Sequence, residues 1–310
     1  MWFKNLKVFR LTDHWAQHVA KLDEALRADA FSPAEDLEAT ASGWVPPRDD
    51  DERLAIDVQG QYLLGFRIEK KLLPASVINQ TVKSRAQVLE AEQGYTPGRK
   101  QLRDLKQSVT DELLPRAFSV ARDIRIWIDP VNRWLIIDAA SAAQSDEVLS
   151  ALGRSLNPYP VEPLKLAHSA GALMTEWLLS GEAPEGLTID DDSQWQATGD
   201  QAASIRYVHH DLPSQTIESH VEAGYQCTRL GLTWQDRVSF VLTETADLKR
   251  VTPLDVIEER SNQAITLTPA EKFESDFTLM SAELAKLLDA LMAVLGEDRD
   301  ESPTATTTKP

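Results

Sequence analysis

The chain of 310 residues contains little cysteine and no long apolar run. Its single cysteine, Cys227, excludes an internal disulfide and is typical of a protein from the reducing cytoplasm. No nearby motif would lower the pKa of that thiol, so we interpret Cys227 as buried and unreactive. No stretch approaches the ~20 apolar residues that a membrane-spanning helix needs. The N-terminal segment MWFKNLKVFRL alternates, which predicts a first strand and not a signal peptide.

Motifs that carry catalysis are also missing. The sequence has no GxxxxGK[ST] phosphate loop, no GxGxxG after a strand, no HExxH and no GxSxG. His209 and His210 with His220 form the nearest approach to a ligand cluster, but zinc usually takes four ligands, which this spacing and one cysteine do not supply. The acidic runs 49–52 and 190–192 predict solvated loops, with a Mg²⁺-dependent nuclease as the alternative. We therefore expect no catalytic residue, no cofactor and no metal site.

Positive charge is scarce and unevenly distributed. The formal net charge is −17, which by itself argues against a polyanionic partner. Between Phe66 and Arg125, however, twelve Lys and Arg face seven Asp and Glu, a net +5 that leaves −22 for the remainder. Acidic surface elsewhere would confine any nucleic acid to this basic island.

The first half of the chain alternates strand and helix patterns, which predicts an α+β fold. Residues 2–11 and 61–68 are expected as strands, and Thr12 or Asp13 is expected to cap a helix that ends near Ala28. The chain 124–138 predicts a β-hairpin around the turn Asp129–Asn132. Helices over 76–93 and 99–114, joined by the turn sequence Tyr-Thr-Pro-Gly, predict a protruding helical hairpin.

The second half predicts further helices and strands. Ser145 is expected to cap a helix to Leu156, Ser169 a helix to Gly181, and Thr268 a helix to Leu295. Residues 182–203 are expected to be irregular. Strands are expected at 204–210, 225–233 and 236–243, and a helix at 214–223. We expect a central domain (1–75 with 115–165), a hairpin tip (76–114), a base domain (166–296) and a disordered tail (297–310).

Several ordered motifs resemble one protein family. The segments WFKNLKVFRL near the start, GWVPP at 43–47, KLLPASVINQ at 71–80 and LLPRAFS at 113–119 resemble the N-terminal half of the bacterial recombination-associated RdgC family. TWQDRVSFV at 233–241 and FESDFTLMSAELAKLL at 273–288 continue the resemblance, which covers roughly residues 1–296.

The resemblance implies a non-catalytic DNA-binding protein. Members of this family form ring-shaped homodimers that encircle double-stranded DNA with little sequence preference and act against RecA-dependent recombination, so cytoplasm and nucleoid are the expected location. The resemblance places a dimer gate at Phe118, in the LPRAF motif, and a hinge in the C-terminal half. An ordinary core position is the alternative for Phe118. A recombination regulator that acts mainly through protein–protein contacts is the alternative function, because the acidic remainder would suit a basic partner.

Binding without sequence preference needs cations on phosphates. By position, the predicted DNA-binding residues are Lys71, Arg85, Arg99, Lys100, Arg103, Lys106 and Arg116, with Lys4 and Lys7 as weaker candidates. A solvated amphipathic hairpin is the alternative for the helical segment. His209 and His210 complete the predicted DNA-binding set. They stand where some family members carry Lys-Gln, and neutral histidine gives up a cation there. If both histidines face the hole, DNA affinity should rise below about pH 6.5.

Overall fold

The computed structural model describes residues 2–12, 15, 18–199, 203–255, 257 and 268–297. The strands are β1 (Leu6–Leu11), β2 (Thr40–Val45), β3 (Ala55–Val58), β4 (Gln61–Lys71), β5 (Ser119–Asp129), β6 (Trp134–Asp138), β7 (Val161–Pro163), β8 (Leu187–Ala197), β9 (Ser204–Tyr207), β10 (Tyr225–Trp234), β11 (Val238–Thr243) and β12 (Leu248–Pro253). The helices are α1 (Val19–Leu26), α2 (Ala75–Gln93), α3 (Arg99–Leu113), α4 (Ala142–Ser155), α5 (Ala170–Ser180), α6 (Ser214–Glu222) and α8 (Pro269–Val294), with 3-10 turns η1 (Arg27–Asp29) and η2 (Leu114–Arg116).

One antiparallel sheet runs through the whole molecule, so the predicted α+β class is confirmed. Its strand order is β2-β4-β5-β6-β1-β12-β11-β10-β8-β9, with β3 beside β4 and β7 beside β1. Strand β1 joins the two halves of the sheet, because it pairs with β6 on one side and with β12 on the other. The β6 pairing covers five residues of β1, whereas the β12 pairing is the single register pair Leu6–Leu248.

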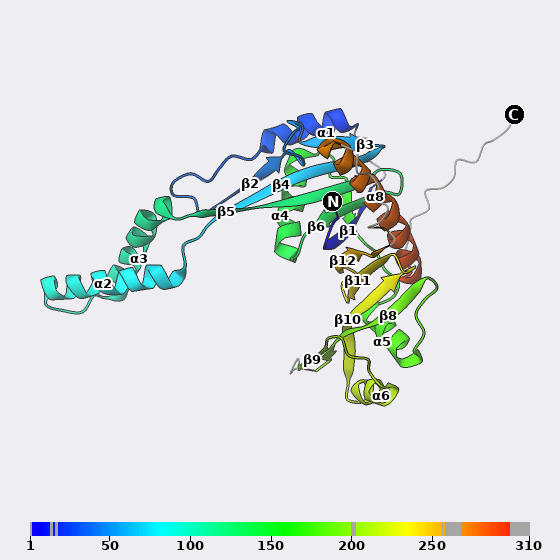
Figure 1. Cartoon of the computed structure of the whole chain (residues 1–310). Helices are drawn as coiled ribbons and strands as arrows, with labels where there is room; N and C mark the ends of the chain where they lie inside the picture. The colour runs from blue at the N-terminus through cyan, green and yellow to red at the C-terminus, as the bar shows by residue number, and fades with distance from the viewer. Residues whose placement is uncertain are drawn as a thin grey trace.

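Alternation along the strands places side chains in two cores on opposite faces of the sheet. On β5, Ile124, Ile126 and Ile128 belong to the core that α1 and α4 cover. Trp127 points to the other face, into the core built with α8. Helix α8 crosses the junction of the two sheet halves (Figure 1). Its residues pack with side chains from both halves, which ties the halves together.

The C-terminal half of the sheet has helices on one face. In the described part of the chain, the helices that pack on β8–β12 are α5, α6 and α8, and all of them lie in the α8 core. Leu230 of β10 and Leu248 of β12 point into that core, so Arg229 and Lys249 point to the opposite side. We call this opposite side of β8–β12 the open face.

The predicted helical hairpin is confirmed, and it projects from the ends of β4 and β5 (Figure 1). The hairpin buries very little: none of residues 75–93 is buried, and within 99–113 only Val109 is. Helix α2 therefore contributes no residue to a buried core. Val77 and Val88 are 43% and 58% exposed, because α2 packs mainly on α3 and these two residues point away from it.

Some predicted helix starts are right and others are wrong. Ser169 and Thr268 cap α5 and α8, and Thr268 forms a full capping box with Glu271. The cap of α4 is Ser141, whose hydroxyl accepts the Gln144 amide, whereas Ser145 lies inside the helix and donates to the Ala142 carbonyl. Serine favours caps at both positions, and only packing separates them. Likewise α1 starts after His18, so Thr12 does not cap it, and Asp13 lies outside the described residues.

The prediction that residues 182–203 are irregular is wrong. Residues 187–197 form β8, which pairs with both β10 and β9. Its alternation buries Ser193 and Trp195 and leaves Asp190 and Asp192 toward the open face. Aspartate disfavours strands, but the pairing on both sides outweighs that weak local preference. Strand β12 was not predicted, and β9 is shorter than expected, because it ends at Tyr207.

The division into domains stays a prediction, and residues 298–310 of the expected disordered tail lie outside the described chain. Within the described residues, no helix combines the length and apolar content that crossing a membrane requires.

Candidate nucleic-acid interface

Four of the predicted DNA-binding cations lie on the outer part of the hairpin. Arg99 and Lys100 open α3, and Arg103 and Lys106 follow within two turns; all four are exposed. The Arg103 side chain is 80% exposed and only approaches Asp104, at 4.0 Å. These side chains can meet a phosphate without giving up a strong partner.

Other predicted cations are already engaged within the chain. Lys71 donates to the backbone carbonyls of Glu35 and Asp36, which fastens that loop to the end of β4. Arg85 donates to Glu112 at 2.7 Å and links α2 to α3. Lys7, a weaker candidate, forms an ion pair with Asp247 across the junction of the sheet halves. Each of these three would have to leave a partner before it could bind DNA. Arg116 and Lys4 are exposed.

An exposed apolar patch lies at the base of the hairpin. Phe118 is 85% exposed, so the core interpretation of this residue is wrong for the single chain. The Leu72 amide donates to the Phe118 carbonyl at 2.7 Å, which sets these two residues opposite each other. Val120, two residues along β5, points to the same side. Leu72 and Val120 are 53% and 51% exposed. We call Leu72, Phe118 and Val120 the base patch.

The histidine candidates lie at a different end of the molecule. His209 and His210 lie in the segment between β9 and α6, two elements that are far from the hairpin in Figure 1. The His209 amide donates to Asp192 at 2.9 Å, while its side chain is 89% exposed. His210 stacks on Tyr207, whose hydroxyl lies 2.8 Å from Nε2 of His220. The predicted residues therefore form two separate sets, one on the hairpin and one beside the open face.

A cationic cleft between these sets was missed by sequence reasoning. It has a volume of about 280 Å³, lies on the open face next to the junction, and is lined by residues that include Arg206, Arg229, Lys249, Arg250, Asp192 and Tyr207. These cations come from three strands and form no run in the sequence. The signal that could have found them is register, because Arg206 of β9 and Arg229 of β10 both face Gln194 of β8.

Comparison with known proteins places the chain in a family. The family model described as "RdgC: Putative exonuclease, RdgC" matches residues 1–298. The chain belongs to the RdgC family. Relatives named "Recombination-associated protein RdgC" are 50% identical in Bordetella parapertussis, over 96% of this chain and 99% of the relative, and 50% identical in Burkholderia cenocepacia, over 97% and 98%. A third, from Ralstonia nicotianae, is 49% identical over 97% of this chain and 98% of its own length.

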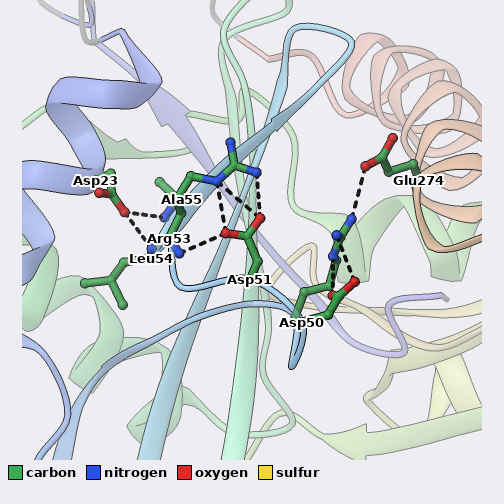
Figure 2. A network of polar contacts seen from close by, with 8 residues as sticks. Asp23, Asp50, Asp51, Arg53, Leu54, Ala55 and Glu274 are labelled. Atoms are coloured by element: carbon green, nitrogen blue, oxygen red, sulfur yellow. Dashed lines mark hydrogen bonds and ion pairs between the residues drawn. The ribbon is translucent and has the colours of Figure 1, made fainter. Parts of the chain in front are cut away.

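The acidic run 49–52 of this RdgC chain forms ion pairs that connect neighbouring elements. Figure 2 shows the 49–52 run between α1 and α8: Asp50 binds Arg48, which also reaches Glu274 of α8, and Asp51 binds Arg53. The hydrogen bonds from Arg53 hold the pKa of Asp51 at about 2. On the other side, Asp23 of α1 accepts the backbone amides of Leu54 and Ala55 (Figure 2). The predicted solvated loop is therefore confirmed, since Asp49, Asp50 and Glu52 are exposed, and its ion pairs also tie the loop to α8.

The second acidic run lies on the open face of β8 in this RdgC chain. Asp190 accepts the Thr233 hydroxyl, and burial raises the pKa of its carboxyl. Asp192 binds Arg250 and the His209 amide; although burial opposes it, these two donors hold the pKa of Asp192 below its usual range. Among the residues that the structure describes, no group of three or more His, Cys, Asp or Glu is arranged to hold a metal ion.

Proposed function

We propose that this protein is a ring-forming homodimer that binds double-stranded DNA without sequence preference at the nucleoid and acts against RecA-dependent recombination, without catalysing a reaction. The observation that carries the proposal is the base patch, where Phe118 is 85% exposed on a projecting arm. An exposed aromatic side chain with exposed apolar neighbours indicates a surface that binds another protein. The names of the relatives support the link to recombination.

A two-fold dimer would close through identical surfaces. In such a dimer each base patch meets the patch of the second copy, and every cation is present twice. Arg103 on the hairpin and Arg206 and Arg229 on the sheet are exposed, which suits contacts with phosphate oxygens along the duplex. Since phosphate contacts carry no sequence information, this arrangement predicts binding to any duplex.

The experiment that tests the function compares DNA topologies. Purified protein is titrated with linear duplex and with covalently closed circular duplex across a salt series, for the natural sequence, Phe118→Ser and Val131→Ser. Val131 is 79% exposed in the turn between β5 and β6, so it is a matched apolar control outside the base patch. We expect steep salt dependence on both DNAs, and loss of circular DNA first for Phe118→Ser alone. Weak or salt-insensitive binding would favour a regulator that acts through protein contacts.

Exonuclease activity is the second candidate, because the matching family model carries that word in its description. The carboxylates available to it include Asp190, Asp191 and Asp192 on β8. Incubating end-labelled linear duplex with the protein and Mg²⁺ or Mn²⁺ tests this candidate. Release of nucleotides that Asp190→Asn abolishes would establish it, and intact DNA under all conditions would leave the non-catalytic proposal in place.

A further inference from the structure

The cationic cleft has a regular construction across the open face. Arg206, Gln194 and Arg229 lie directly beside one another on β9, β8 and β10. Neighbouring strands are about 4.8 Å apart, so the two arginines stand roughly 10 Å from each other on one face. Lys249 and Arg250, on β12, lie two strands further along and line the same cleft. The cations therefore recur on every second strand, although Lys249 is in register with Gly231 of β10, two residues along from Arg229.

The cations of the cleft differ in whether they already have a partner within the chain. Arg206 and Arg229 are exposed, and the described part of the chain offers neither of them an ion-pair partner. Lys249 is half-buried and donates to the carbonyls of Ala139 and Ala140 at 3.0 and 3.2 Å, so it serves mainly to hold the junction. Burial lowers the pKa of Lys249. Arg250 is held by Asp192.

We propose that this cleft is the main binding site for the phosphate backbone of DNA, with Arg206 and Arg229 each binding a phosphate. Asp192 competes with the DNA phosphates for Arg250. The inference rests on the proposed function, since it takes duplex DNA as the ligand. A guanidinium group can donate two parallel hydrogen bonds to the oxygens of one phosphate. Arg206 and Arg229 can do this without first breaking an ion pair of the described chain. Gln194, between the two arginines, adds an uncharged donor.

The cations of the cleft are held in more fixed positions than the cations of the hairpin. The hairpin cations stand on an arm that buries only Val109 within 99–113, so their positions depend on a weakly packed element. Arg206 and Arg229 stand on paired strands of one sheet, whose spacing is set by the backbone ladder. A DNA strand that crosses this face presents a phosphate about every 3.4 Å of axial rise, so two cations ~10 Å apart reach separate phosphates.

Asp192 is a built-in competitor for the same ligand. It is the carboxylate that binds Arg250 in the cleft, and it also accepts the His209 amide, which keeps it in place. Asp192→Asn retains an oxygen for the His209 amide but removes the charge that holds Arg250. Arg250 then becomes available to a third phosphate, and binding strengthens.

The test measures the salt dependence of binding for matched double variants. Fluorescence anisotropy with a labelled 30-base-pair duplex, in a series of salt concentrations, compares the natural sequence with Arg206→Gln/Arg229→Gln and with the hairpin control Arg99→Gln/Arg103→Gln. Each double variant removes two exposed cations. Each phosphate contact contributes a slope of about −0.9, and the dimer carries each arginine twice. We therefore expect the cleft variant to reduce the slope by up to about 3.6 per dimer, and the hairpin control to reduce it much less. Asp192→Asn should bind more tightly, with a slope steeper by up to about 1.8 per dimer, because one Arg250 is freed in each copy.

The outcomes separate this inference from the proposed function. If the natural sequence binds DNA with a steep salt slope and only the hairpin control reduces that slope, the cleft is not the main phosphate-binding site, and the proposed function stands. If the natural sequence shows no salt-dependent binding, the proposed function fails first. Titration with tripolyphosphate tests whether the cleft is a site for a small anion instead of DNA. The inference would be overturned if tripolyphosphate bound tightly to the natural sequence and not to the cleft variant, while the cleft variant kept the natural salt slope on DNA. Unchanged thermal unfolding of the variants confirms that each remains folded, as exposed side chains predict.

Discussion

Replacing Phe118 by serine should weaken self-association without weakening the fold. Because the side chain is 85% exposed in the single chain, removing it takes almost nothing from the core, and the free energy of unfolding should change by less than about 0.5 kcal/mol. In a two-fold dimer, both copies of Phe118 become buried. Full burial of such a side chain contributes about 1.5–3 kcal/mol, so the two copies contribute roughly 3–6 kcal/mol. The dimer dissociation constant should then rise about 10²- to 10⁴-fold.

Sedimentation equilibrium over a dilution series measures that dissociation constant, and thermal unfolding of each variant measures the stability. Val131→Ser is the control, because it removes an equally exposed apolar side chain from a turn outside the base patch. Two results would refute the reasoning. One is an unchanged dissociation constant for Phe118→Ser. The other is a drop of several degrees in its melting temperature, which would mean that Phe118 supports the fold.

Three further predictions concern the rest of the chain. Burial raises the pKa of Cys227 to about 12, so a thiol reagent at pH 8 should leave the native protein unmodified and react once it is unfolded in guanidinium; native reaction would contradict the buried position. Ser141→Ala removes the cap of α4 and should cost about 1 kcal/mol in urea unfolding, and a neutral result would show that α4 starts elsewhere. The pKa of Asp51 is lowered from 3.8 to about 2 by Arg53, so this carboxylate stabilises the fold above about pH 4 and loses that contribution as the pH falls toward 2. The difference in melting temperature between the natural sequence and Asp51→Asn should therefore shrink across this range, and a constant difference would contradict the pairing.

Local signals in the sequence were sufficient for several elements. The Tyr-Thr-Pro-Gly turn between two amphipathic runs predicted the helical hairpin, and Thr268 with Glu271 predicted the start of α8. These features succeed because their cause lies within a few residues: a turn residue sets the backbone angle, and a side chain binds an amide of its own first turn. Such interactions form in much the same way wherever the segment is placed.

Other features depended on residues that are distant in the sequence. The acidic run at 190–192 has the composition of a loop, yet it is a strand, because β10 and β9 pair with it from both sides. Phe118 has the local pattern of a core residue, yet no other element covers it in the described chain. Burial depends on what packs against a side chain, and the sequence near Phe118 holds no information about that.

By itself, the sequence determined the charge imbalance, the presence of a single cysteine, the helical hairpin and the family resemblance, since all of these depend on composition or on contiguous motifs. Only the tertiary structure separated the candidate cations into free and engaged ones: Arg85 and Lys71 have partners that lie 27 and 36 residues away. It alone brought Arg206, Arg229 and Arg250 to one cleft, because strand pairing brings together residues that are far apart along the chain. Phosphate binding depends on the distances between cations in space, and the pairing of the strands sets those distances.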